Sequence, residues 1–227
     1  MGDLPLDGSG HRQRLRQRLF EGGPDALLDH ELVEYLLALA IPRRDTKPLA
    51  KKLLHDFGGL GGLLTADAEA IVRIGGVSEG AAAALKIAQA SALRLLEKGI
   101  EGRPVLGSWQ ALLDYLHADM AHNPVERVRV LYLNAKNMLI RNERMSEGSV
   151  DEAAVYVREV IRRALEYHAT AMILVHNHPS GDPQPSQADI RLTREIVEAA
   201  GPLRISVHDH VIIGTSGSYS MRSNGLV

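Results

Sequence analysis

Two histidines and an aspartate lie on one short stretch of the sequence, at a spacing that suits metal binding. His176 and His178 follow an apolar run, residues 171 to 175, whose length and composition predict a buried strand. Side chains two residues apart on extended chain point to the same side, so one ion can contact both imidazoles. A loop with three prolines and one glycine then leads to Ser186 and Asp189, where a helical pattern begins. Two nitrogen ligands and one carboxylate leave the fourth position of a tetrahedral Zn²⁺ free for water, the arrangement of a catalytic site.

Each half of this pattern also has an ordinary structural explanation. A lone His-x-His is common, and Ser-x-x-Asp is a capping box that begins many helices. The capping role of Ser186 does not compete with metal binding, because the cap would fix the turn that presents Asp189. The two halves together, His-x-His-x7-Ser-x2-Asp, are therefore more informative than either alone.

The complete pattern resembles the metal motif of the JAMM (MPN) metallopeptidases. The wording around it, HNHPSGDPQPSQAD, is similar to the RadC branch of that superfamily. The resemblance to RadC proteins extends over nearly the whole chain, including DHEL at residues 29 to 32, FGGL at 57 to 60 and DHVIIG at 209 to 214. One departure is Val157, where RadC relatives usually have proline, a residue that favours a helix start. We expect this departure to leave the metal site unchanged.

The resemblance implies a zinc-dependent hydrolase of the JAMM/MPN type, with peptidase-like or isopeptidase-like cleavage of an amide by a metal-activated water. His176, His178 and Asp189 would hold the Zn²⁺. JAMM enzymes take their general base from a glutamate at the start of an apolar strand after the first helix of the domain, and Glu126 matches that position. Ser186 would donate a hydrogen bond to the developing oxyanion.

Other carboxylates and polar residues compete for these roles. Glu143 and Glu147 are alternative bases, but both follow the second strand of an expected hairpin, and neither begins an apolar strand. As an isolated residue, Glu126 would be a solvated carboxylate at a strand end. Asn177 and Ser180 could support the metal ligands or only brace the loop.

Two further patterns suggest other chemistry. His208 and His210 form a second His-x-His, but no Ser-x-x-Asp follows, so a structural role in the sheet is favoured over a second metal site. Residues 176 to 178 also spell HNH. The three residues of HNH nucleases are dispersed over a hairpin and a helix, so the contiguous tripeptide is no evidence for one.

Composition restricts the classes of protein. The chain has 227 residues, of which 45% are hydrophobic and 24% are charged, and its formal net charge is -2. These values are typical of a globular protein and not of a strongly basic protein that binds the phosphate backbone of a nucleic acid. The absence of cysteine excludes disulfides, thiolate zinc sites and the zinc deaminases. No signal core or membrane-length apolar run is present, so we expect a cytoplasmic protein that does not contact the membrane.

The patterns predict an α/β (α+β) fold in two domains. Residues 1–102 would form a small all-α, helix-hairpin-helix-like domain, and residues 103–227 a JAMM/MPN-like mixed sheet with flanking helices. Expected helices after the linker are 109 to 121, one opened by a capping box at 149 to 152 that runs to about 168, and 187 to 200. Expected strands are 128 to 133, 138 to 140, the run before the histidines, 205 to 207 and 211 to 213.

The helical half raises an alternative function, a DNA-associated protein related to repair in which the metal site is secondary. Four arginines alternate between residues 12 and 18, and residues 69 to 96 resemble a helix-hairpin-helix. The second glycine of that hairpin is replaced by Ser78, and only Arg73 and Lys86 flank the turn, which favours a packing or partner module. For the hydrolase, the partner would be a peptide or protein substrate whose identity the sequence does not give. A scaffold without turnover is disfavoured, because every catalytic position is filled.

Overall fold

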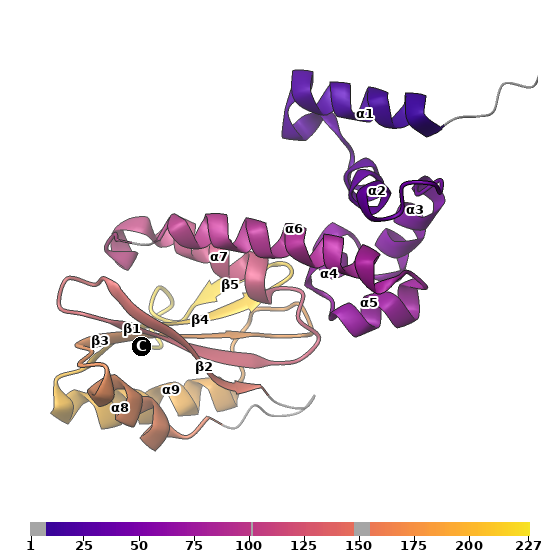
Figure 1. Ribbon diagram of the computed structural model, residues 1–227. Helices are drawn as coiled ribbons and strands as arrows, with labels where there is room; N and C mark the ends of the chain where they lie inside the picture. The colour runs from indigo at the N-terminus through magenta and orange to yellow at the C-terminus, as the bar shows by residue number, and fades with distance from the viewer. Residues whose placement is uncertain (1–7, 101, 148–154) are drawn as a thin grey trace, which may run out of the picture. The chain divides into compact units, whose positions relative to one another are not determined.

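The computed structural model describes residues 8–100, 102–147 and 155–227 (Figure 1). The described chain divides into two compact units, Met1–Ser91 and Ala92–Val227, with the division inside one long helix. The sequence-based boundary between residues 102 and 103 stays a prediction. Among the helices of the described residues, none is both long and apolar enough to cross a membrane.

The first unit is built from short helices around one apolar core. Its elements are α1 (Gly8–Gly22), the 3-10 turn η1 (Pro24–Ala26), α2 (Asp29–Ala40), α3 (Lys47–Asp56), α4 (Leu60–Thr65), α5 (Ala68–Gly75) and the first part of α6 (Glu79–Lys98). Buried leucine and isoleucine side chains from α2 to α6 form the core, including Leu37, Leu53, Ile71 and Leu85. This confirms the expected N-terminal helical region.

The helix-hairpin-helix-like segment is present as α5, a glycine turn and α6. Gly76 has a φ of 64°, the left-handed conformation that glycine adopts without strain. In the rest of the turn, Val77 is buried in the helical core, and the Ser78 hydroxyl accepts a hydrogen bond from the Ala81 amide at 3.3 Å. Val77 therefore packs inward, while the exposed Ser78 caps α6.

The residues before α3 and α7 (Trp109–Met120) do not cap these helices with their side chains. Thr46 and Ser108 directly precede α3 and α7, but neither side chain accepts a capping bond. The Thr46 hydroxyl donates to the Glu34 carbonyl at 2.9 Å, and Ser108 donates to the Pro104 carbonyl at 3.2 Å. The Thr46 hydroxyl therefore connects to α2 and the Ser108 hydroxyl to the start of the 3-10 turn η2 (Val105–Ser108), and neither caps the helix that follows it.

The second unit is a five-stranded mixed sheet with helices on both faces. After the 3-10 turn η2 (Val105–Ser108) and α7 come β1 (Arg127–Leu133), β2 (Leu139–Glu147), α8 (Val157–Glu166), β3 (Ala171–Asn177), α9 (Gln187–Ala200), the 3-10 turn η3 (Gly201–Leu203), β4 (Ser206–Gly214) and β5 (Gly217–Ser220). The strand order is β2-β1-β3-β4-β5. Only β3 and β4 pair in parallel; the other neighbours are antiparallel. The structure confirms the predicted α/β class.

Alternating side chains place one core on each face of the sheet. Figure 1 shows α7 on one face and α8 with α9 on the other. Leu131, Ile173 and Val211 face α7, where they pack with Leu112 and Leu116. Strand side chains of the opposite parity, among them Val130 and Leu174, pack with Val160 of α8 and Ile196 of α9.

Several element bounds differ from the sequence-based expectation. β2 runs to Glu147 because it is an edge strand, and its polar residues do not interrupt the pairing with β1. The two short strands expected near the C-terminus are one strand, β4, which continues past an irregularity in its pairing with β3. β5 was not predicted. α8 begins at Val157 and ends at Glu166, and the capping box expected at residues 149 to 152 lies outside the described residues.

Candidate metal centre

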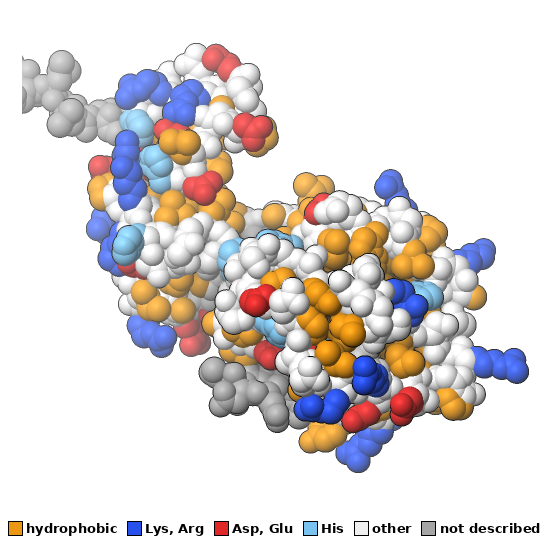
Figure 2. Space-filling model, turned by 180° about the vertical axis from the view of Figure 1, so that it is seen from behind, with side chains coloured by type: hydrophobic (Ala, Val, Ile, Leu, Met, Phe, Trp, Pro, Cys, Tyr) orange, Lys and Arg blue, Asp and Glu red, His pale blue; other side chains and the backbone are white. Residues whose placement is uncertain are grey.

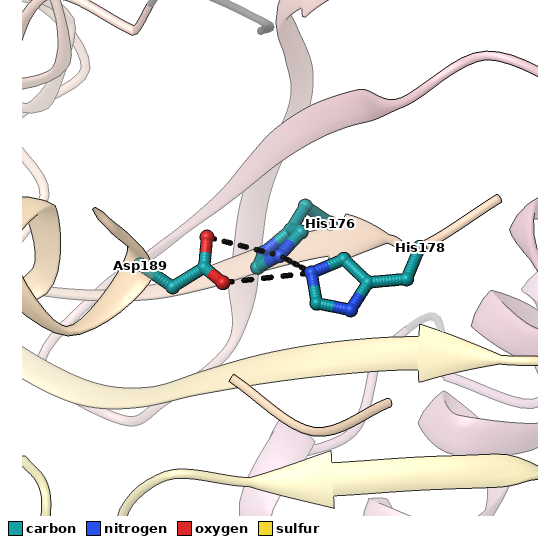
Figure 3. Close-up of side chains that lie close together, drawn as sticks. All are labelled: His176, His178 and Asp189. Atoms are coloured by element: carbon teal, nitrogen blue, oxygen red, sulfur yellow. Dashed lines mark hydrogen bonds and ion pairs between the residues drawn. The ribbon is translucent and has the colours of Figure 1, made fainter. Parts of the chain in front are cut away.

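The three residues expected to bind metal converge at one end of the sheet. His176 lies near the end of β3, His178 directly follows the strand, and Asp189 lies in the first turn of α9. Their side chains point toward one another (Figure 3). The His176 and His178 Nε2 atoms are 2.9 Å apart, and they lie 3.3 Å and 3.5 Å from the Asp189 Oδ1 and Oδ2 atoms. These side chains are 2%, 17% and 13% exposed.

Asp189 is held by the capping box that the sequence predicted. Its Oδ2 atom accepts from the Ser186 backbone amide and from the Ser186 hydroxyl, both at 2.7 Å, and its own amide donates to the hydroxyl at 3.2 Å. Burial would raise the pKa of Asp189, but its interactions with His176, His178 and the Ser186 hydroxyl outweigh burial and hold this pKa far below its ordinary range. The side chain is therefore a carboxylate.

The hydrogen bond of His178 to the loop shows which of its ring nitrogens is free. His178 Nδ1 lies 2.9 Å from the Asp182 carbonyl oxygen, which can only accept, so Nδ1 carries a proton. The other ring nitrogen, Nε2, faces His176 and Asp189. The hydrogen bond with Asp189 is the largest cause that raises the pKa of His178.

These donor atoms fit a divalent metal ion. The two histidines and Asp189 form a group whose potential ligand atoms all lie within 4.8 Å of one another. The pairs at 3.3 Å and 3.5 Å match the edge of a tetrahedron around Zn²⁺, which is roughly 3.3 Å for bonds of about 2.0 to 2.1 Å. A proton or a metal cation between the Nε2 atoms is needed, because two lone pairs at 2.9 Å repel each other. Nitrogen and carboxylate donors suit zinc better than magnesium or calcium.

Glu126 lies beside this group, directly before β1. The antiparallel ladder of β1 and β3 ends at the pair of Val128 and His176. Glu126 and His178 each lie two residues beyond that pair, at the same end of the two strands. The negative charge of Glu126 also contributes to the raised pKa of His178. Its role as a base stays a prediction.

Asn177 fixes the backbone on both sides of Glu126. This fully buried side chain accepts from the Arg127 amide at 2.9 Å and donates to the Val125 and Asn123 carbonyls at 3.2 Å and 3.3 Å. One amide side chain of β3 therefore positions the segment that precedes β1. Ser180, the other expected supporting residue, accepts from the Asp182 amide at 3.4 Å within the loop.

The alternative bases lie elsewhere or are not described. Glu143 on β2 forms an ion pair with Arg163 of α8 at 3.3 Å, and it also raises the pKa of Tyr167 through a hydrogen bond. Its contacts are thus with α8. The side chain of Glu147 lies outside the described residues.

The second His-x-His contacts two different groups. His208 Nε2 lies 2.7 Å from the Asn137 side-chain oxygen, in the turn between β1 and β2. His210 is buried and lies 2.7 Å from Nδ1 of His176 and 2.6 Å from the hydroxyl of Thr193. Sequence reasoning missed these contacts of His210 and Thr193, because they depend on the parallel pairing of β3 with β4, which no local pattern reveals.

Two family models match the chain, one over each of its two parts. Residues 106–226 match the family model "RadC-like JAB domain", and residues 9–83 match "UPF0758 N-terminal". The mixed sheet and its His-His-Asp group are thus those of a JAB-type domain, as the sequence resemblance implied. The chain belongs to the RadC-like family of UPF0758 proteins.

Two curated relatives agree with this assignment. A "UPF0758 protein" of Rhodobacter capsulatus is 51% identical over 213 residues, which cover 94% of this chain and 100% of the relative. A second UPF0758 protein, from Ruegeria pomeroyi, is 50% identical over 215 residues, which cover 95% of this chain and 96% of the relative. The similarity therefore spans both the helical region and the JAB-like domain.

Proposed function

We propose that this protein is a zinc-dependent hydrolase that cleaves an amide bond in a peptide or protein substrate, as a peptidase or isopeptidase does. The observation that carries the proposal is the convergence of two imidazole Nε2 atoms and the ionised Asp189 at a strand end, with the negative charge of Glu126 near His178. A purely structural cluster would not require the additional carboxylate of Glu126 near the ligands.

In this proposal His176, His178 and Asp189 hold the Zn²⁺. When bound there, the ion supplies Lewis-acid chemistry, which polarises a carbonyl and makes water a stronger nucleophile at neutral pH. Glu126 takes a proton from the attacking water and returns it to the leaving nitrogen. The exposed Ser186 turns its hydroxyl from Asp189 to the oxyanion that develops on the substrate.

Amide hydrolysis by protein with and without metal tests the proposal. The full chain is stripped with a chelator, reloaded with Zn²⁺, and incubated with quenched fluorescent peptides and with a lysine isopeptide. We expect cleavage by the reloaded wild type, and none by the stripped protein or by His178→Ala. A chain that binds zinc but cleaves neither amide class would contradict the proposed activity and support the scaffold alternative.

Binding of DNA by the helical unit is the alternative, and several of the residues that suggested it have internal partners. Arg12 donates to the carbonyls of Pro42 and Arg44, and Arg18 pairs with Glu31 at 2.8 Å. On the face shown in Figure 2, basic and acidic side chains are interspersed. These contacts leave fewer cations to meet a phosphate backbone.

The cations beside the glycine turn follow the same pattern. The Lys86 ammonium donates to the carbonyls of Leu64 and Ala66 at 2.8 Å and 3.0 Å, while Arg73 is exposed. Binding of a labelled duplex at two salt concentrations tests the alternative, because phosphate contacts give an affinity that falls steeply as salt rises. Weak association that does not depend on salt would favour a protein-interaction role for the helical unit.

A further inference from the structure

Behind the three expected ligands lies a chain of buried polar groups that the proposed hydrolysis does not use. His176 Nδ1 is 2.7 Å from His210 Nε2, His210 Nδ1 is 2.6 Å from the Thr193 hydroxyl, and that hydroxyl is 2.5 Å from the Asp189 carbonyl oxygen. The chain begins at one ligand and ends at the backbone of another. His176, His210 and Thr193 are all buried.

The direction of every hydrogen bond in this series of polar groups can be deduced from its last member, the Asp189 carbonyl. A carbonyl oxygen only accepts, so the single hydroxyl proton of Thr193 points to Asp189. The other acceptor near that hydroxyl, the Met221 sulfur, is farther away at 3.6 Å and weaker. With its proton committed, the Thr193 oxygen must accept from Nδ1 of His210.

The same reasoning then assigns the ring protons of His210 and His176. A fully buried imidazole with no carboxylate bonded to it is neutral, because an unpaired buried charge is costly. His210 therefore carries its proton on Nδ1 and a lone pair on Nε2, and it accepts from Nδ1–H of His176. The proton of His176 is thus on Nδ1, and its Nε2 lone pair points at His178 and Asp189.

We propose that Thr193 and His210 are positioning residues that hold His176 in the tautomer and ring orientation required for metal binding. Reversing the direction of the chain would place a proton on His176 Nε2, toward the metal position, and would leave the Thr193 oxygen 2.5 Å from a carbonyl oxygen with no proton between them. His178 reaches the same tautomer independently, through the Asp182 carbonyl. Both Nδ1 atoms therefore carry a proton, and both Nε2 atoms face the position of an ion.

This series of hydrogen bonds also connects β3, which carries His176, with α9, which carries Asp189. Thr193 and Asp189 belong to α9, whereas His176 is on β3 and His210 on β4. A shift of the first turn of α9 would therefore disturb the ring of His176 as well as the carboxylate. Supporting residues of this kind typically change metal affinity by roughly 10- to 100-fold when they are removed.

Imidazole tautomers measured by NMR test the inference directly. Long-range ¹H–¹⁵N spectra of the metal-free full chain should show His176 and His210 each with the proton on Nδ1. In Thr193→Val, which keeps the side-chain shape and removes the hydroxyl, a second tautomer should appear at both rings. A wild-type His176 that carries its proton on Nε2 would overturn the inference.

Zinc affinity, measured by competition with a chromophoric chelator, provides the second readout. We expect Thr193→Val to bind zinc about 10-fold or more weakly, and Thr193→Ser to restore affinity because it keeps the hydroxyl. Thr65→Val is the matched control, since Thr65 also donates to a carbonyl four residues earlier, at 2.8 Å, in the helical unit. Unchanged imidazole tautomers and unchanged zinc affinity in Thr193→Val would show that Thr193 and His210 do not position His176.

The inference rests on the proposed metal site, and the two can fail separately. Absence of zinc binding or hydrolysis in the wild type would count against the proposed function. The tautomers are read in the metal-free protein, so they still decide whether Thr193 and His210 set the protonation of His176.

Discussion

Glu126 lies near enough to His178 to influence its pKa, but the two residues should respond differently to substitution. Glu126→Gln removes the proposed base and is nearly isosteric, so we expect the protein to keep its fold and its zinc while hydrolysis falls by about 10² or more. His178→Ala removes a ligand, so zinc and activity should be lost together. Zinc content, circular dichroism and cleavage rate, measured on the same preparations, separate these outcomes.

Glu143→Gln is the matched control for the base, because Glu143 lies on the neighbouring strand and pairs with Arg163. This variant should keep zinc and most of its activity. A collapse of hydrolysis in Glu143→Gln, with Glu126→Gln still active, would show that the base is misassigned.

At the residue scale, the sequence predicted the ligands because their placement is local. The period-two spacing of His176 and His178 and the capping box of Ser186 and Asp189 depend only on a strand end and a helix start. His210 could not be predicted in the same way. His210 lies 34 residues after His176, and the two side chains meet because β3 and β4 pair in parallel. Only the complete fold determines this pairing.

At the scale of elements, the loop between β3 and α9 depends on close packing against the end of β4. A Cβ added at Gly214 would lie 2.2 Å from the Gly181 carbonyl oxygen and 3.0 Å from the Pro183 nitrogen, both backbone atoms. The loop would have to move, and with it the Asp182 carbonyl that orients His178. Gly214→Ala should therefore lower zinc affinity by about 10-fold or more in chelator competition.

Gly201→Ala is the control for this loop. Gly201 has a φ of -53°, and no neighbouring atom lies within 4 Å of the added Cβ, so its zinc affinity should stay at the wild-type value. Equal affinity in Gly214→Ala and the wild type would mean that the loop position does not control His178.

Helix α1 is held mainly by polar contacts, because Leu15 is its one buried apolar side chain among the described residues of the helix. Arg18 donates to both carboxylate oxygens of Glu31, at 2.8 Å and 3.0 Å, and this lowers the pKa of Glu31 from 4.5 to about 2. A lowered pKa stabilises the folded state above the ordinary pKa. We therefore expect the docking of α1 to weaken as the pH falls from about 4.5 toward 2.

Glu31→Gln should reproduce this loss at neutral pH. Amide hydrogen exchange in α1 should become roughly five- to tenfold faster, the effect of one charge-assisted hydrogen bond. Glu21→Gln changes an exposed pair with Gln17 on the same helix and should have little effect. Exchange that is equally slow in Glu31→Gln would mean that the ion pair does not hold α1.

Elements were predicted best where one local signal is strong. The pattern from residues 187 to 200 gave α9 with the observed bounds, since a capping box begins it and a glycine follows it. β2 and β5 were underestimated or missed because edge strands carry polar residues on their exposed side. The Thr46 hydroxyl bonds to a carbonyl of α2, a partner that a local pattern cannot reveal.

At the scale of the whole molecule, the proposed site lies entirely in the second unit. Ile100 is buried with Leu112 and Leu116 in the core beneath α7, and Leu96 packs against the same core. A fragment of residues 92–227 should therefore bind zinc like the full chain. A fragment of residues 103–227 lacks Ile100 and should be less stable by about 2 to 5 kcal/mol in urea unfolding. Equal stability of the two fragments would support the boundary that the sequence predicted.

The metal content of the full chain tests whether His176, His178 and Asp189 bind zinc. Protein purified at neutral pH without chelator, and analysed by inductively coupled plasma mass spectrometry, should contain about one equivalent of zinc, while folded His178→Ala should contain almost none. Less than about a tenth of an equivalent in the folded wild type, even after incubation with excess zinc, would contradict the account.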